Sequence, residues 1–119
     1  MGESTLISGK IIKTKGDFVV IDTAFGSMPF KAGGQLGASV TLAVRPENLH
    51  LKGDSRAIPL GTAKVSAVTF QGSFKRILAE SDLIPRQSFV ARTVAGLETA
   101  VGDTVTPCCN PEDMILLVS

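Results

Sequence analysis

Two stretches of the chain repeat one pattern that decides the fold class: residues 37–51 read GASVTLAVRPENLHL, and residues 102–116 read GDTVTPCCNPEDMIL. Aligned without gaps, they share six identical residues in fifteen positions, several times more than chance composition would give. Each copy contains a glycine, a run of β-forming residues, a Pro-Glu dipeptide and a second short apolar run. Because proline fixes φ and cannot donate to a ladder, Pro46 and Pro111 should end each strand and force a corner. The repeat therefore predicts a strand–corner–strand unit that occurs twice around a β core.

The rest of the chain also carries strand signals. Short runs rich in Val, Ile, Thr and Phe are bounded by Gly, Pro, Asp or Asn, as is typical of strands joined by turns. With the repeat included, these runs predict strands over residues 6–13, 18–23, 40–45, 63–70, 74–79, 89–94, 104–109 and 114–118. Lys15-Gly16-Asp17 predicts a hairpin turn, and Gly33-Gly34 and Gly53-Asp54 predict further turns. No segment keeps a 3.6-residue apolar period, so helix is limited to a turn after Pro46 or Pro111.

These elements predict one all-β domain over residues 1–119. Its first half is expected over about residues 6–51, a linker over 52–60 and its second half over 61–118. The apolar segments that follow the corners, Leu49–Leu51 and Met114–Val118, are expected to close one half each.

Composition narrows the function classes. Hydrophobic residues make up 44% of the 119 residues, enough to fold without metals or disulfides. Twelve Lys and Arg against eleven Asp and Glu leave no basic excess, which argues against a non-specific nucleic-acid binder. No apolar run approaches the length of about 20 residues that crosses a bilayer, and the first residues lack the pattern of a signal peptide. A cytoplasmic location is expected.

The sequence contains no recognisable catalytic or metal-binding set. Cys108 and Cys109 are adjacent, which is poor geometry for a disulfide, so they are expected to be two small buried hydrophobic residues. The single histidine, His50, has no partner at ligand spacing. No Gly-x-x-x-x-Gly-Lys-Ser/Thr loop is present, since Gly9-Lys10 lacks the required context. ATP hydrolysis, an enzyme activity and a cofactor are not expected.

Four motifs resemble one family in order and spacing. Val44–Leu51 resembles the Arg-Pro-Glu-Asp/Asn-Leu signature of the TOBE domain, the transport-associated OB-like module. Val68–Ser73 resembles its aromatic Gly-Ser turn, Val101–Val105 its penultimate strand, and Asn110–Leu117 its closing turn and strand. The resemblance covers nearly the whole chain.

Two departures concern the transported solute more than the fold. The family often has an aromatic residue where Cys109 stands, and Ser81–Gln87 replaces a short polar hairpin.

The resemblance implies an OB-like β-barrel and a regulatory role. In the family, the module follows the nucleotide-binding domain of ATPase subunits in ABC importers for polyamines, ferric iron or sugars. It implies a non-catalytic regulatory and dimerisation domain, whose partners are a second copy, its own nucleotide-binding domain and the membrane subunits. Such a chain would lie at the inner membrane through the transporter complex, without direct membrane insertion and without nucleic acid.

Two sets of residues are candidate contact sites. The first set is the corner motif, and its members are Arg45, Pro46, Glu47 and Asn48, echoed by Pro111 and Glu112. Pro-Glu recurs in both copies and so is expected to shape the corner, whereas Arg45 does not recur and is the better candidate for a specific contact.

The second set is the turn Gly72-Ser73 with Arg76, which is either a solvated strand edge or an anion site built from turn amides and a guanidinium group. This set supports an alternative function, a small-molecule or oxyanion-sensing module. A nucleic-acid-binding OB domain is the weakest alternative, because the six phenylalanines lie beside Val and Ile, as core residues do, and no basic groove accompanies them.

Overall fold

The computed structural model describes residues 4–31, 39–51, 57–94 and 99–118, and in these ranges the chain is built from β-strands and two short 3-10 turns. The strands are β1 (Thr5–Lys15), β2 (Phe18–Thr23), β3 (Gly26–Lys31), β4 (Ser39–Val44), β5 (Ile58–Pro59), β6 (Ala63–Gln71), β7 (Phe74–Ser81), β8 (Ser88–Val94), β9 (Thr104–Val105), β10 (Cys108–Cys109) and β11 (Ile115–Val118). The 3-10 turns are η1 (Pro46–Asn48) and η2 (Pro111–Asp113). No helix in these ranges has the length and apolar character that crossing a membrane would require.

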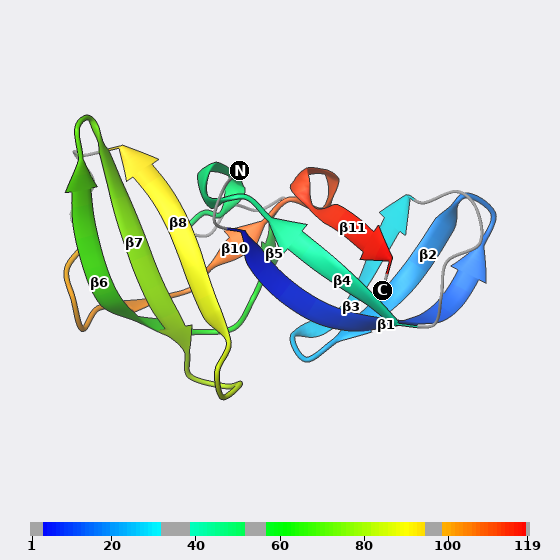
Figure 1. The fold of residues 1–119 in the computed structure, drawn as a ribbon. Coiled ribbons are helices and arrows are strands. Elements are labelled where there is room, and N and C mark those ends of the chain that lie inside the picture. The colour runs from blue at the N-terminus through cyan, green and yellow to red at the C-terminus, as the bar shows by residue number, and fades with distance from the viewer. Residues whose placement is uncertain (1–3, 32–38, 52–56, 95–98, 119) are drawn as a thin grey trace.

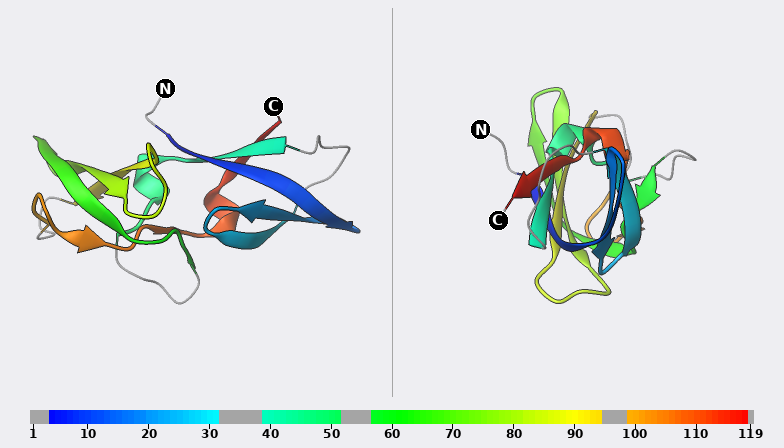
Figure 2. Two further views of the ribbon diagram at one scale, coloured as in Figure 1. Left: turned by 90° about the horizontal axis from the view of Figure 1, so that it is seen from below. Right: turned by 90° about the vertical axis from the view of Figure 1, so that its right-hand side faces the viewer.

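The strands form two curled antiparallel sheets at opposite ends of an elongated molecule (Figures 1 and 2). One sheet has the order β11-β4-β1-β2-β3, and the other has the order β8-β7-β6-β9. The short pair β10-β5 lies between them (Figure 1). Side chains alternate between core and solvent along β1, β2 and β7, as expected of sheets with one buried face.

The two halves of the repeat exchange their last segments. After η2 the chain crosses to the first half, where Ile115 of β11 pairs with Ala43 of β4. After η1 it crosses to the second half, where His50 makes an isolated bridge to Cys108. The two pairings are equivalent under the sequence repeat, because residue 50 aligns with residue 115 and residue 43 aligns with residue 108. Each segment therefore pairs with the opposite half, which the sequence had not indicated.

The corners redirect the chain at each crossing. In η1 the Asn48 N–H donates to the Arg45 carbonyl (2.9 Å), and in η2 the Asp113 N–H donates to the Asn110 carbonyl (2.9 Å). Proline stands at the start of each turn, where its missing N–H costs nothing. Each turn redirects the chain away from its own sheet, and η1 then contacts β8 while η2 contacts β3.

One hydrophobic core joins the two halves. It includes Ile7 and Leu42 of the first sheet and Ile77 and Phe89 of the second. The rings of Phe25 and Phe89 lie 5.9 Å apart, which is a contact between the β2–β3 turn and β8.

Hydrogen bonds add to this joint between the halves. The Val90 N–H donates to Thr5 Oγ1 (3.0 Å), and the Gln87 amide donates to the Leu6 carbonyl (3.1 Å).

Most predicted strands are confirmed, and the differences have physical causes. β2 and the hairpin turn at Gly16, where φ is +59°, are as predicted, and so are the turns after the two prolines. The prediction missed β3, whose Gly26 and Pro29 argue against a strand, although an edge strand tolerates proline.

Three further differences concern the second half and the linker. The predicted strand over 104–109 is divided into β9 and β10 around Pro107, and the predicted linker contains β5. The segment after η1 contributes an isolated bridge and no strand of its own. The turns predicted at Gly33-Gly34 and Gly53-Asp54 lie outside the described residues.

Candidate functional site

The first corner lies at the edge of an open groove of about 1040 Å³, here called the first corner groove. Its wall and floor come from η1, β6, β7, β8 and β11, and the lining side chains are Ser4, Ala43, Arg45, Pro46, Glu47, Gln71, Arg76, Val90, Arg92, Ile115 and Leu117. Four of the residues singled out from the sequence meet here, because Arg45, Pro46 and Glu47 face the same groove as Arg76.

The exchange of segments builds this groove. η1 belongs to the first half of the repeat, yet it contacts β8 of the second. Val90 of β8 lines the groove and is only 9% exposed although its neighbour Arg92 is exposed. The corner therefore forms one side of the groove and the outer face of β7 and β8 forms the other.

Two arginines of the groove face each other across the β7–β8 ladder. Arg76 pairs directly with Arg92, so their side chains share one face of the sheet. Like charges directly opposite each other repel, and they raise the local positive potential. The Arg92 guanidinium lies over the Phe74 ring, 4.4 Å from its centroid, which helps to fix its position.

The groove is positively charged. The three arginines and the single carboxylate of Glu47 give its described lining a formal charge of about +2 at neutral pH. Arg76 is half-buried, and a guanidinium that is partly shielded from water attracts an anion more strongly than an exposed one. Guanidinium groups offer paired N–H donors that match the oxygen spacing of carboxylates and oxyanions. The Gln71 amide and the Ser4 hydroxyl supply further donors.

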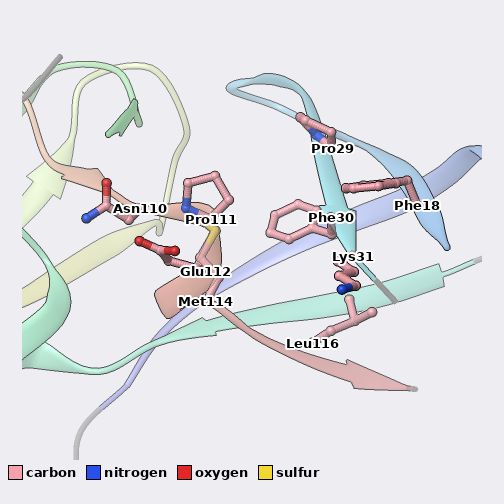
Figure 3. A pocket seen from close by; sticks show the side chains of 9 residues that line it. All are labelled: Phe18, Pro29, Phe30, Lys31, Asn110, Pro111, Glu112, Met114 and Leu116. Carbon is pink, nitrogen blue, oxygen red and sulfur yellow. The ribbon is translucent and has the colours of Figure 1, made fainter. Parts of the chain in front are cut away.

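The second corner borders another groove, of about 630 Å³, here called the second corner groove (Figure 3). Its lining side chains are Phe18, Pro29, Phe30, Lys31, Asn110, Pro111, Glu112, Met114 and Leu116. It is built in the same way as the first, because η2 of the second half contacts β3 of the first. Asn110 occupies the repeat position of Arg45, and most of the wall is apolar. The duplication thus produces two grooves with different chemistry.

The remaining residues singled out from the sequence lie elsewhere. Asn48 is half-buried in η1, and Gly72 and Ser73 form the exposed β6–β7 turn, where Gly72 has a φ of +66°. Along the β6–β7 ladder, Gln71 and Phe74 form the pair nearest this turn. Arg76 pairs with Thr69, which lies farther from the turn. Arg76 and Arg45 line the first corner groove, whereas Gly72 and Ser73 are not among its lining residues. Sequence reasoning missed Arg92, because only the β7–β8 register brings it opposite Arg76.

Cys108 and Cys109 are buried thiols that form no disulfide, as the sequence predicts. Burial raises the pKa of the Cys109 thiol from 9.0 to about 12, with smaller contributions from Asp113 and Cys108. Such a thiol stays protonated near neutral pH and is a poor nucleophile and metal ligand. In the part of the chain that the structure describes, no group of three or more His, Cys, Asp and Glu side chains could hold a metal ion.

The Cys109 thiol should make the protein less stable at high pH. The unfolded chain releases this proton near pH 9 and the folded chain only near pH 12, so the free energy of unfolding is unaffected below about pH 9 and falls by up to about 1.4 kcal/mol per pH unit above it. Urea denaturation at about pH 8.5 and about pH 10.5 measures the change. Cys109→Ala should show a smaller loss between the two pH values, and equal losses would contradict the assignment.

Comparisons with known proteins agree with this fold. The sequence profile of the TOBE domain matches residues 42–117, which is more than half of the chain. Among curated protein sequences, none matches this chain. The chain is similar to a crystal structure of the cytoplasmic molybdate-binding protein ModG, in a PEG-grown form with molybdate bound. That similarity has a TM-score of 0.69 at 16% sequence identity and covers 96% of this chain and 95% of the other.

The profile match includes the first corner and ends just beyond the second. The structural similarity confirms the predicted all-β, OB-like architecture, with its curled half-barrel sheets. The chain therefore belongs to the TOBE domain family.

Proposed function

We propose that this chain is a non-catalytic binding module that holds a tetrahedral oxyanion of the molybdate type in the first corner groove. The observation that carries the proposal is the convergence of Arg45, Arg76 and Arg92 on one groove from three different elements. The formal charge of about +2 on the groove lining would balance the charge of a dianion.

The structural similarity supports the same ligand class. ModG is described as a molybdate-binding protein, and the similarity covers 95% of that chain, so it extends over nearly the whole of a protein with this activity. The proposal for the present chain rests on its own arginines, because 16% identity carries the fold alone.

Removing one of the paired arginines should weaken oxyanion binding at least about tenfold, since a hydrogen bond to a charged group contributes about 1.5–3 kcal/mol. Isothermal titration calorimetry with sodium molybdate, at low ionic strength, measures this for Arg76→Gln and Arg92→Gln. Arg86→Gln is the matched control, because Arg86 is an exposed arginine in the β7–β8 connection that does not line the groove. Sulfate competition reports how far the site selects among oxyanions.

Two results would contradict the proposal. One is the absence of binding by the unaltered chain at millimolar molybdate. The other is an equal loss of affinity in Arg86→Gln, which would indicate a diffuse charge effect and no specific site. Thermal unfolding of each variant separates lost binding from lost folding.

A second candidate function is favoured by the family match over residues 42–117, which contains the Arg45-Pro46-Glu47 corner. We infer a regulatory and dimerisation role in the ATP-binding subunit of an ABC import system of the polyamine, iron or sugar type. The partners would be a second copy, the nucleotide-binding domain and the membrane subunits, with the complex at the cytoplasmic side of the inner membrane. Light scattering over a range of concentrations tests self-association, and a strict monomer would count against this role. An oxyanion in the groove would then act as an effector, because a ligand that prefers one state shifts the equilibrium between states.

A further inference from the structure

The second corner groove has the dimensions and lining of a small-molecule site. Its volume of about 630 Å³ lies within the range of roughly 300–1000 Å³ that is usual for such sites. Most of the lining is apolar, and two of its residues are already well buried, since Phe30 is 6% exposed and Met114 is 9% exposed. Phe18 is 53% exposed, so its ring offers apolar surface that a ligand could cover. Figure 3 shows the Phe30 ring directed toward Pro111 and Met114.

Charged groups lie at two sides of this apolar surface. The carboxylate of Glu112 lies beside the Asn110 amide, on one side of Met114, and Lys31 lies on the other side (Figure 3). Glu112 and Lys31 are both exposed and come from different halves of the repeat. A ligand must therefore present a cationic end to Glu112, an anionic end to Lys31 and an apolar body between them.

The second corner groove differs from the first in its charge. Arg45 of the first corner has Asn110 as its counterpart in the second. The opposite wall of the first groove carries Arg76 and Arg92, whereas the opposite wall of the second carries phenylalanine, proline and one lysine. With one cation and one carboxylate, the second groove has no excess charge for a dianion. Its chemistry selects a neutral molecule with separated charges.

We propose that the second corner groove binds a small zwitterionic ligand of the class of ω-amino acids, whose ammonium and carboxylate groups stand at opposite ends of an aliphatic chain. Its ammonium group contacts the Glu112 carboxylate and the Asn110 side-chain oxygen, and its carboxylate contacts Lys31. Its aliphatic chain packs on Phe30 and Met114. This site is separate from the first corner groove and does not depend on oxyanion binding there.

Methyl NMR of protein labelled with 13C-methyl methionine tests the proposal, because Met114 lines the groove whereas Met28 is 1% exposed in the core. The probes are 6-aminohexanoate, hexylamine with only the cationic end, and hexanoate with only the anionic end. 6-Aminohexanoate should shift the Met114 signal in a saturable way with a Kd of about a millimolar, and each single-ended probe should bind about five- to tenfold more weakly. The Met28 signal should not move.

Charge removal provides the specific control. Glu112→Gln and Lys31→Gln should each weaken 6-aminohexanoate binding about five- to tenfold. Glu47→Gln changes the repeat counterpart of Glu112 in the other groove and should have no effect. An unmoved Met114 signal, equal affinity for all three probes, or an equal loss in Glu47→Gln would overturn the proposal. Molybdate is absent from this experiment, so its outcome is independent of the proposed oxyanion site.

Discussion

Phe89→Ala is expected to lower the free energy of unfolding by about 3–5 kcal/mol, the usual cost of removing a buried aromatic side chain. Phe89 is fully buried in the core that joins the two sheets, and its ring contacts Phe25 of the first half. The loss should therefore destabilise both halves together and not the second sheet alone. Unfolding of the unaltered chain should accordingly be a single cooperative transition.

Urea denaturation followed by circular dichroism measures this loss, and Phe70→Ala is the matched control. Phe70 is 69% exposed, and its ring contacts the Lys75 ammonium group at 5.3 Å from the centroid, so its removal should cost less than about 1 kcal/mol. Similar losses in the two variants, or two separate transitions in the unaltered chain, would show that the halves do not share one core.

Gly9→Ala is expected to destabilise the protein by about 1–3 kcal/mol, although alanine normally suits a strand better than glycine does. A Cβ atom at position 9 would lie 2.5 Å from Ile21 Cγ2 and 3.3 Å from the Asp22 carbonyl oxygen. Ile21 is fully buried and cannot withdraw without disturbing the core. The glycine therefore permits the close approach of β1 and β2.

Ser8→Ala is the control for this prediction, because Ser8 is the exposed neighbour of Gly9 in the same strand. It should change the free energy of unfolding by less than about 0.5 kcal/mol. A Gly9→Ala variant as stable as the unaltered chain would mean that β1 and β2 can separate slightly at no cost.

The sequence repeat predicted the local geometry well. Pro46 and Pro111 end their strands and start a 3-10 turn, because the chemistry of proline acts within a few residues. The core residues of β2 and β7 follow from alternation for the same reason. What the repeat could not show is the partner of each segment after its corner. A segment of the second half fits β4 because the duplicated halves have equivalent edges, and only the assembled structure selects between equivalent partners.

The candidate site was predictable only where a local signal in the sequence marked a residue. Arg45 stood out because its counterpart in the repeat is Asn110, and it does line the first corner groove. Arg76 was tied in the sequence to the nearby Gly72-Ser73 turn, whereas in the structure it lines the same groove as Arg45. Arg92 carried no local signal, since its position opposite Arg76 depends on strand register. A site assembled from both halves is visible only once their exchange is known.

The duplication also gives the two grooves a shared frame and separate chemistry. Both are formed by a Pro-Glu corner that lies against a strand of the opposite half. One is lined by guanidinium groups and the other mostly by apolar side chains, so the lining of each groove can differ without a change in the corner that shapes it.

The most direct measurement is anomalous X-ray diffraction from crystals grown with molybdate, because the scattering of molybdenum locates the ion without assumptions about its ligands. We expect a peak in the first corner groove, within hydrogen-bonding distance of the guanidinium groups of Arg76 and Arg92, and a much weaker peak in Arg76→Gln crystals. A peak at another place, or none in this groove in crystals of a chain that binds molybdate in solution, would contradict it.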